Sequence, residues 1–192
     1  MPRITVGPGT LVLGAVVGLF AWGTVSQSLP TGFAVAVCVA VGAGLIASVA
    51  LHELGHALVA GACGGEVHEI AISFMGGHTR YARGSIRPWQ SFLISAAGPA
   101  MNGGLALLFS IGAPVWNEGQ RGGATLVTAA VGTLCLLMML LNLGLAIFNV
   151  IPGLPLDGGR MLESLLVAVG VPEVRATMVA ASASRRASTS SG

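Results

Sequence analysis

The chain has 192 residues, of which 54% are hydrophobic and only 8% are charged. Soluble domains carry about 25% charged residues, so this composition excludes an ordinary soluble protein and predicts a membrane protein. The formal net charge is only +2, and all nine basic residues are arginine, so the chain offers no polybasic segment that would bind nucleic acid.

Four apolar stretches are long enough to cross the hydrocarbon core of a bilayer, which takes roughly 20 helical residues. They cover Ile4–Val25, Phe33–Ala62, Trp89–Trp116 and Ala124–Ile151. A signal peptide is the alternative for the first stretch, but its apolar core is long and no small-residue cleavage site follows closely. We therefore expect an all-α polytopic membrane protein with about four transmembrane helices.

The arginines predict the orientation of these helices. Arg80, Arg83 and Arg87 lie between the second and third stretches and Arg160 follows the fourth, whereas the first-to-second connection has no charge. By the positive-inside rule, the N-terminus and the loops after the second and fourth stretches face the cytoplasm. We expect a multi-pass protein of the cell membrane.

The second stretch ends in "LHELGHALVAG", residues 51–61. Residues four apart on an α-helix are offset by only about 40°, so His52 and His56 project from one face and can reach one ion. Glu53 stands beside that ion, where it can accept a proton from a water that the metal activates, as in zinc hydrolases with the H-E-x-x-H motif. Ionisable residues inside a span are costly, so their presence here indicates function.

A catalytic zinc needs a third protein ligand. Ala62 stands where the metzincin pattern requires histidine, Glu66 and Glu69 follow the histidine helix too closely, and Glu118 lies in a loop on the opposite side. Asp157 is then the best candidate, in "NVIPGLPLDGGR", whose prolines and glycines must break the fourth helix; a solvated turn is the alternative for this segment.

Three cysteines, Cys38, Cys63 and Cys135, are dispersed in apolar sequence without a CxxC pair. They are interpreted as small buried hydrophobic residues rather than disulfides or metal ligands. Cys63 is the less favoured alternative for a ligand, because it follows His56 by seven residues and falls near the same helical face.

Three motifs carry a resemblance to a known family: "HELGH", "AAGPAMN" at residues 96–102, and "NVIPGLPLDGG" at residues 149–159. In this order and at these places the chain resembles the site-2 protease family, the intramembrane zinc metalloproteases of peptidase family M50, over roughly residues 33–170. The resemblance implies that His52, His56 and Asp157 bind one zinc ion, that Glu53 is the general base, and that the site opens towards the cytoplasm.

The resemblance also implies that Asn102 orients substrate or stabilises the developing oxyanion. A bond between helices is the alternative role, since a side-chain amide can serve either purpose. Gly98 and Pro99 are interpreted as close helix packing with a local break, and Asn149 as a group that satisfies the backbone freed by Pro152.

Between the second and third stretches, "HEIAISFMGGHTRYA" alternates apolar and polar residues and then supplies a glycine pair for a turn. This pattern predicts a β-hairpin, and the family is known for one near the mouth of the active site. Its edge can hold a substrate in extended form by strand addition. His68 and His78 lie in this segment and are interpreted as solvated loop residues.

Residues 160–170 have leucines at helical spacing and predict a short interfacial helix. We expect a metalloprotease core over residues 1–183 and a disordered polar tail over residues 184–192. Family members with six spans have two further helices here, and others carry PDZ or CBS domains, for which this chain has no room. Substrate recruitment would then use the membrane core or another protein.

The resulting hypothesis is an intramembrane metalloprotease that hydrolyses peptide bonds within or next to transmembrane segments. Glu53 would take the proton of the activated water and pass it to the leaving amine. Family analogy suggests a membrane-anchored regulator, such as an anti-sigma factor, as substrate. A catalytically idle binding or scaffold member of the family is one alternative, and a metal transporter is another, less favoured because the first and third stretches contain no ionisable interior side chain. Cobalt and manganese are alternatives to zinc.

Overall fold

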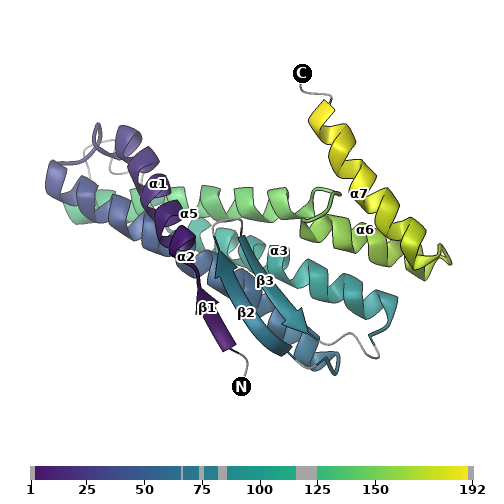
Figure 1. Cartoon of the computed structure of the whole chain (residues 1–192). Coiled ribbons are helices and arrows are strands. Elements are labelled where there is room, and N and C mark those ends of the chain that lie inside the picture. Colours follow the sequence, from purple (N-terminus) through teal and green to yellow (C-terminus); the bar gives the residue numbers. More distant parts are fainter. Residues whose placement is uncertain (1–2, 66, 74–75, 82–85, 116–124, 190–192) are drawn as a thin grey trace.

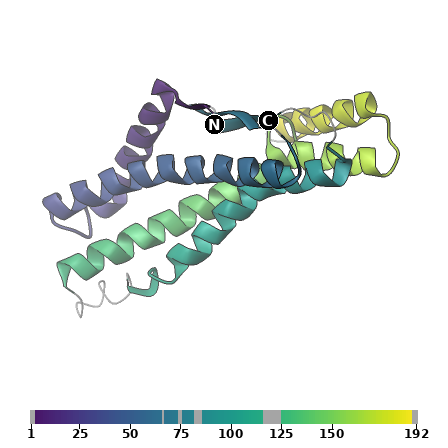
Figure 2. The ribbon, with the colours of Figure 1, turned by 90° about the horizontal axis from the view of Figure 1, so that it is seen from below.

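The computed structural model describes residues 3–65, 67–73, 76–81, 86–115 and 125–189. Three long helices lie side by side at its centre: α2 (Thr31–Ala62), α3 (Pro88–Ser110) and α5 (Leu126–Val150). Figures 1 and 2 show that α2 and α5 start at the same end of the bundle and that α3 runs in the opposite direction. By length and composition these helices can each cross a membrane, and each lies within or close to a predicted span.

The helix α1 (Pro8–Val25) crosses the first half of α2. The two backbones touch where glycines meet, since a Cβ added at Gly42 would lie 2.5 Å from the carbonyl oxygen of Gly14. The predicted first span started too early, because Arg3–Val6 forms the strand β1 instead of helix. The described residues thus contain three helices that meet the length and hydropathy of a span, with α1 as a shorter apolar helix.

A small sheet lies beside the second half of α2 (Figure 1). It has the order β1-β2-β3, in which β2 (Val67–Ser73) pairs parallel with β1 and antiparallel with β3 (Gly76–Tyr81). The predicted pair of strands thus has a third partner, β1, that the sequence pattern did not indicate. Gly76 and Gly77, expected in the turn, begin β3, and residues 74–75 lie outside the described residues.

The chain turns sharply after α5. Pro152 has no N–H to continue the helix, and the next helix, α6 (Asp157–Ala168), begins after the cis peptide bond between Leu154 and Pro155. This helix lies in the predicted place of the short interfacial helix. Its first residue is Asp157, so the turn decides where that carboxylate lies.

The last helix, α7 (Glu173–Thr189), packs on α6 and then leaves it, pointing away from the central helices in Figure 1. It also contacts the turn after α5, where the Leu154 N–H donates to the Ala180 carbonyl over 3.4 Å. The structure therefore differs from the disordered tail predicted from residue 184, as far as Thr189. Alanine and arginine are frequent in this segment and are among the strongest helix formers.

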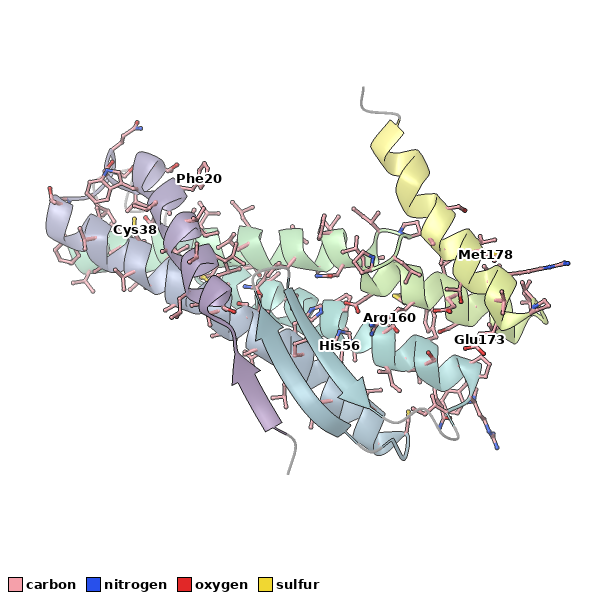
Figure 3. All side chains as sticks on the ribbon, in the orientation of Figure 1. Phe20, Cys38, His56, Arg160, Glu173 and Met178 are labelled. Carbon is pink, nitrogen blue, oxygen red and sulfur yellow. The ribbon has the colours of Figure 1, made fainter. Side chains whose placement is uncertain are left out.

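Apolar and polar buried residues separate along the bundle. The main apolar cluster joins the first half of α2 to α1 and α5, and its buried members are Val25, Leu29, Ala34, Val37, Cys38, Val41 and Ala130. Large apolar side chains elsewhere face outwards, such as Phe20, which is 81% exposed on α1 (Figure 3). Buried histidine, glutamate and asparagine side chains lie in the second half of α2 and on the helices that face it. Such groups need partners in an apolar interior, and they mark the candidate site.

Candidate metal centre

His52 and His56 lie one turn apart on the face of α2 that points into the bundle, as their spacing predicts. Their side chains are almost completely buried, and their rings meet edge to face with centroids 4.7 Å apart. The two Nε2 atoms are 3.1 Å apart. Figure 3 shows His56 in the region where α2, α3 and α6 come together.

Asp157 reaches the same point from the first turn of α6. Its Oδ2 lies 3.1 Å from Nε2 of His52 and 3.3 Å from Nε2 of His56. A tetrahedral ion with bonds of about 2.0–2.2 Å has ligand atoms separated by about 3.3–3.6 Å. The three atoms therefore lie close to three corners of a tetrahedron, and the residues fit a metal ion with the fourth position left open.

The other ring nitrogen of each histidine faces an oxygen. Nδ1 of His52 donates to Oδ1 of Asn102 over 3.1 Å, and Nδ1 of His56 donates to the backbone carbonyl of Ile94 over 2.6 Å. Because a carbonyl oxygen can only accept, these bonds place the proton of each neutral ring on Nδ1. When an ion is bound, this leaves the Nε2 lone pair of each ring for the metal. Without the ion, Nε2 of a ring that carries a second proton donates to the carboxylate of Asp157.

Gly98 of α3 closes the site from one side. A Cβ added there would lie 2.6 Å from Nε2 of His52 and closer still to Nε2 of His56. The interpretation of Gly98 as a helix-packing residue was therefore incomplete, because the side that lacks a side chain faces the two nitrogens directly. Its place in "AAGPAMN", near Asn102, was the available sequence signal.

The carboxyl of Asp157 is mostly buried, with 13% of its side chain exposed. Burial alone would raise the pKa of this carboxyl, but the hydrogen bonds and charges of His52 and His56 outweigh it and lower the pKa to about 2. The group is thus a carboxylate at neutral pH and can serve as an anionic ligand.

Two glycines allow α6 to start so close to α5. A Cβ at Gly158 would collide with the carbonyl oxygens of Val150 and Ile151, and one at Gly159 would lie 2.5 Å from the carbonyl carbon of Gly153. The D-G-G sequence therefore places the carboxylate by letting the first turn of α6 pack directly on the backbone before it.

Glu53 is 2% exposed and lies on α2 beside the first histidine. A carboxylate oxygen of Glu53 and one nitrogen from each histidine lie within 4.8 Å of one another. At this distance the Glu53 carboxylate can accept a proton from a water molecule between the two histidines without itself being a metal ligand.

The remaining candidates lie elsewhere or outside the described side chains. Cys63 is the C-cap of α2, about two helical turns beyond His56. Asn149 donates to the carbonyl of Leu145 over 2.9 Å, one turn back in its own helix, and not to the carbonyl of Phe148 that Pro152 leaves free of its usual donor. The side chains of Glu66, Glu69, His68, His78 and Glu118 lie outside those that the structure describes.

Comparison with known proteins connects this geometry to a family. Residues 40–120 and 117–185 match the sequence model of Peptidase family M50. A Synechocystis protein, sll0528, is 44% identical over 125 residues, which are 64% of this chain and 30% of that protein. A Mycobacterium tuberculosis protein, Rip3, is 34% identical over 177 residues, which are 88% of this chain and 43% of that protein. Both are named as zinc metalloproteases, and the chain spans less than half of the length of each.

A solved structure shares the fold. The site-2 protease from Methanocaldococcus jannaschii superposes with a TM-score of 0.56 and 26% sequence identity, over 92% of this chain and 72% of that one. Together with the apolar helices, these matches make the chain a multi-pass membrane protein of the same architecture.

Proposed function

Because the chain belongs to peptidase family M50, the family of the site-2 proteases, we propose that it is an intramembrane zinc metalloprotease that hydrolyses peptide bonds within or next to transmembrane segments of membrane proteins. The observation that carries this proposal is the convergence of two histidine nitrogens and one carboxylate oxygen within 3.1–3.3 Å of one another. A buried group of this kind has no role in apolar packing and fits an open zinc site.

His52, His56 and Asp157 would hold the ion, with both histidines fixed by their Nδ1 partners. A bound zinc ion would supply Lewis acidity, which makes water a nucleophile near neutral pH and polarises a carbonyl. The role of the protein is to orient these ligands before substrate arrives.

Glu53 would act as the general base and then as the general acid. Its carboxylate takes the proton of the attacking water and later gives it to the amine that leaves. Burial near two histidines suits this task, because a proton accepted there stays close to the reacting atoms.

Asn102 supports the site as a positioning residue. It is 0% exposed and its Oδ1 is already bonded to His52, so its observed contact favours the bond between helices over direct contact with substrate. Among the described residues β3 is an edge strand of the sheet next to α2, and strand addition there would hold a substrate in the extended form that hydrolysis needs.

The orientation follows from charge. Arg80, Arg83, Arg87 and Arg160 lie on the same side of the predicted spans as the site, so we place the site opening and the N-terminus in the cytoplasm. The substrate would be the transmembrane segment of another protein, and a membrane-anchored regulator such as an anti-sigma factor is our candidate for regulated intramembrane proteolysis.

The proposal is tested with purified protein in detergent and a panel of tagged single-span substrates. We expect one zinc ion per chain, cleavage that stops on chelation and returns with added zinc, and cut sites that mass spectrometry places in or beside the apolar segment. Zinc binding without any cleavage would favour the idle family member, and zinc-dependent ion flux into liposomes without cleavage would favour the transporter.

A further inference from the structure

Two fully buried amides lie in the helix bundle, Asn102 on α3 and Asn142 on α5, each 0% exposed. Asn102 uses Oδ1 to bind His52, and its Nδ2 has no hydrogen-bond partner among the described residues. Asn142 uses Nδ2 to donate to the Met138 carbonyl over 2.8 Å, and its Oδ1 likewise has none among them. One unpartnered atom is a donor and the other an acceptor, and leaving either without a partner in the interior is costly.

The packing of α3 on α5 places the two amides at similar depth. Just beyond α3, a Cβ at Gly112 would lie 2.6 Å from Sγ of Cys135, and nearer the start of α3 Pro99 lines one cavity together with Ile147. Since Gly112 faces Cys135 and the same cavity borders Pro99 and Ile147, the antiparallel arrangement of α3 and α5 puts the two amides within about one helical turn of each other in depth. Both are completely buried, so both side chains face the interior of the bundle.

The packing of α2 on α5 gives the same depth independently. A Cβ at Gly44 would lie 2.7 Å from Sδ of Met138, and these two helices start at the same end of the bundle (Figure 2). Asn142 is one turn beyond Met138, just as Ser48 is one turn beyond Gly44, and His52 follows after one more turn. The Asn142 amide therefore lies about one helical turn from His52, towards the end of the bundle where α2 and α5 start.

We propose that Asn142 is a second positioning residue of the metal centre, which acts on His52 through a buried water and Asn102. The water accepts from Nδ2 of Asn102 and donates to Oδ1 of Asn142, so that both unpartnered atoms are satisfied by one molecule. This inference rests on the proposed function, since it explains how the zinc ligand is held.

The chemical consequence concerns which way the Asn102 amide points. Rotated by half a turn, the amide would present its NH₂ group to Nδ1 of His52, and Nδ1 would have to act as the acceptor. The proton of the neutral ring would then move to Nε2 and block the nitrogen that faces Asp157. An acceptor at Asn142 favours the productive orientation, because only that orientation directs the NH₂ group towards it.

The test measures zinc affinity by competition with a chelator, using the whole chain in detergent. Asn142→Leu removes the acceptor while keeping the same branching at Cγ, and we expect zinc affinity to fall by about 10–100-fold, the range for loss of a residue that orients a metal ligand. Asn142→Asp is the rescue variant: in the apolar interior it stays protonated, donates to the Met138 carbonyl and keeps an acceptor, so we expect affinity close to that of the native chain.

Thr133→Val is the matched control. Thr133 is a buried α5 residue whose hydroxyl also bonds to the carbonyl one turn back, Ala129, over 2.8 Å, but it lies further from the histidines along the helix. We expect unchanged zinc affinity.

The coupling between the amides makes the test specific. Asn102→Leu should lower zinc affinity as much as Asn142→Leu or more, and the double variant should lose no more than Asn102→Leu alone. Equal zinc affinity in Asn142→Leu and the native chain, or losses that add in the double variant, would overturn the inference. If Asn142→Leu does not fold, Asn142→Ala replaces it with the same expected loss, because it also removes the acceptor.

Zinc affinity is measured without substrate, so this inference and the proposed function fail separately. A native chain that binds zinc and cleaves nothing overturns the function and leaves the role of Asn142 standing. A native chain that cleaves substrates, with zinc affinity unaffected by Asn142→Leu, overturns only the role of Asn142.

Discussion

Replacing Gly98 by alanine should abolish the metal centre while leaving the helices intact. The added Cβ would lie 2.6 Å from Nε2 of His52 and closer to Nε2 of His56, whereas ordinary van der Waals contacts start at 3.4 Å. One or both rings must then retreat by about 1 Å, while metal sites hold ligand distances within about 0.2 Å. This movement would stretch the hydrogen bonds at Nδ1, because Ile94 and Asn102 lie one turn on either side of Gly98 and hold the two rings against α3.

A displacement of about 1 Å at a reacting centre costs on the order of 100-fold in activity, and we expect at least this loss in zinc affinity and in cleavage. Zinc content and a chelator competition provide the assay, with circular dichroism as a check on helix content. Gly103→Ala is the matched control on the same helix, since a Cβ at Gly103 meets nothing within 4 Å. Native zinc affinity in Gly98→Ala would refute the geometry described for the site.

Three further predictions concern the carboxylate of Asp157, the turn that carries it, and the ion that it would bind. In metal-free protein the pKa of Asp157 lies at about 2, below its ordinary 3.8. The interactions of its carboxylate therefore stabilise the fold above about pH 4, and this stabilisation is lost as the pH falls towards 2. Thermal unfolding across that range should show the loss in the native chain and not in Asp157→Asn. Gly158→Ala forces a Cβ against the carbonyls of Val150 and Ile151 and should destabilise the protein by about 1–3 kcal/mol, whereas Gly144→Ala, with open space around it, should not; equal melting temperatures would contradict the packing. Zinc at about 100 times its Kd should raise the free energy of unfolding by about 2.7 kcal/mol. A melting temperature that does not change when zinc is added would show that the folded state does not bind it.

The sequence predicted α2 and α5 closely because the property that defines a span is local, whereas α3 ends at Ser110, before the predicted end of the third stretch at Trp116. A span needs about 20 apolar residues in a row, and α2 and α5 begin and end within two residues of the predicted stretches. The predicted start of the first span was wrong because the structure there depends on a distant part of the chain. Ile4 and Val6 are apolar, as a span requires, but β-branched, as strands favour, and β1 forms because β2, more than 60 residues later, offers a parallel partner.

In the site, too, the positions set by local helix geometry could be predicted, and those set by packing between distant segments could not. His52 and His56 could be placed on one face from their spacing, because helix geometry fixes it within one turn. The approach of Asp157 depends on the turn after α5, and elimination among acidic residues pointed to it without giving its position. The carbonyl of Ile94 could not be predicted at all, since a backbone acceptor has no residue type, and only the packing of α3 on α2 brings it to His56.

The measurement that tests the central claim most directly compares Glu53→Gln with the native chain, for zinc content and for cleavage of a single-span substrate in the same detergent. The amide has nearly the shape of the carboxylate but cannot take up a proton, so we predict one zinc ion per chain in both proteins and cleavage only by the native chain, with a loss of at least about 100-fold. Cleavage by Glu53→Gln at the native rate would contradict the account, because the proton of the attacking water would then have to leave by a route that does not involve this residue.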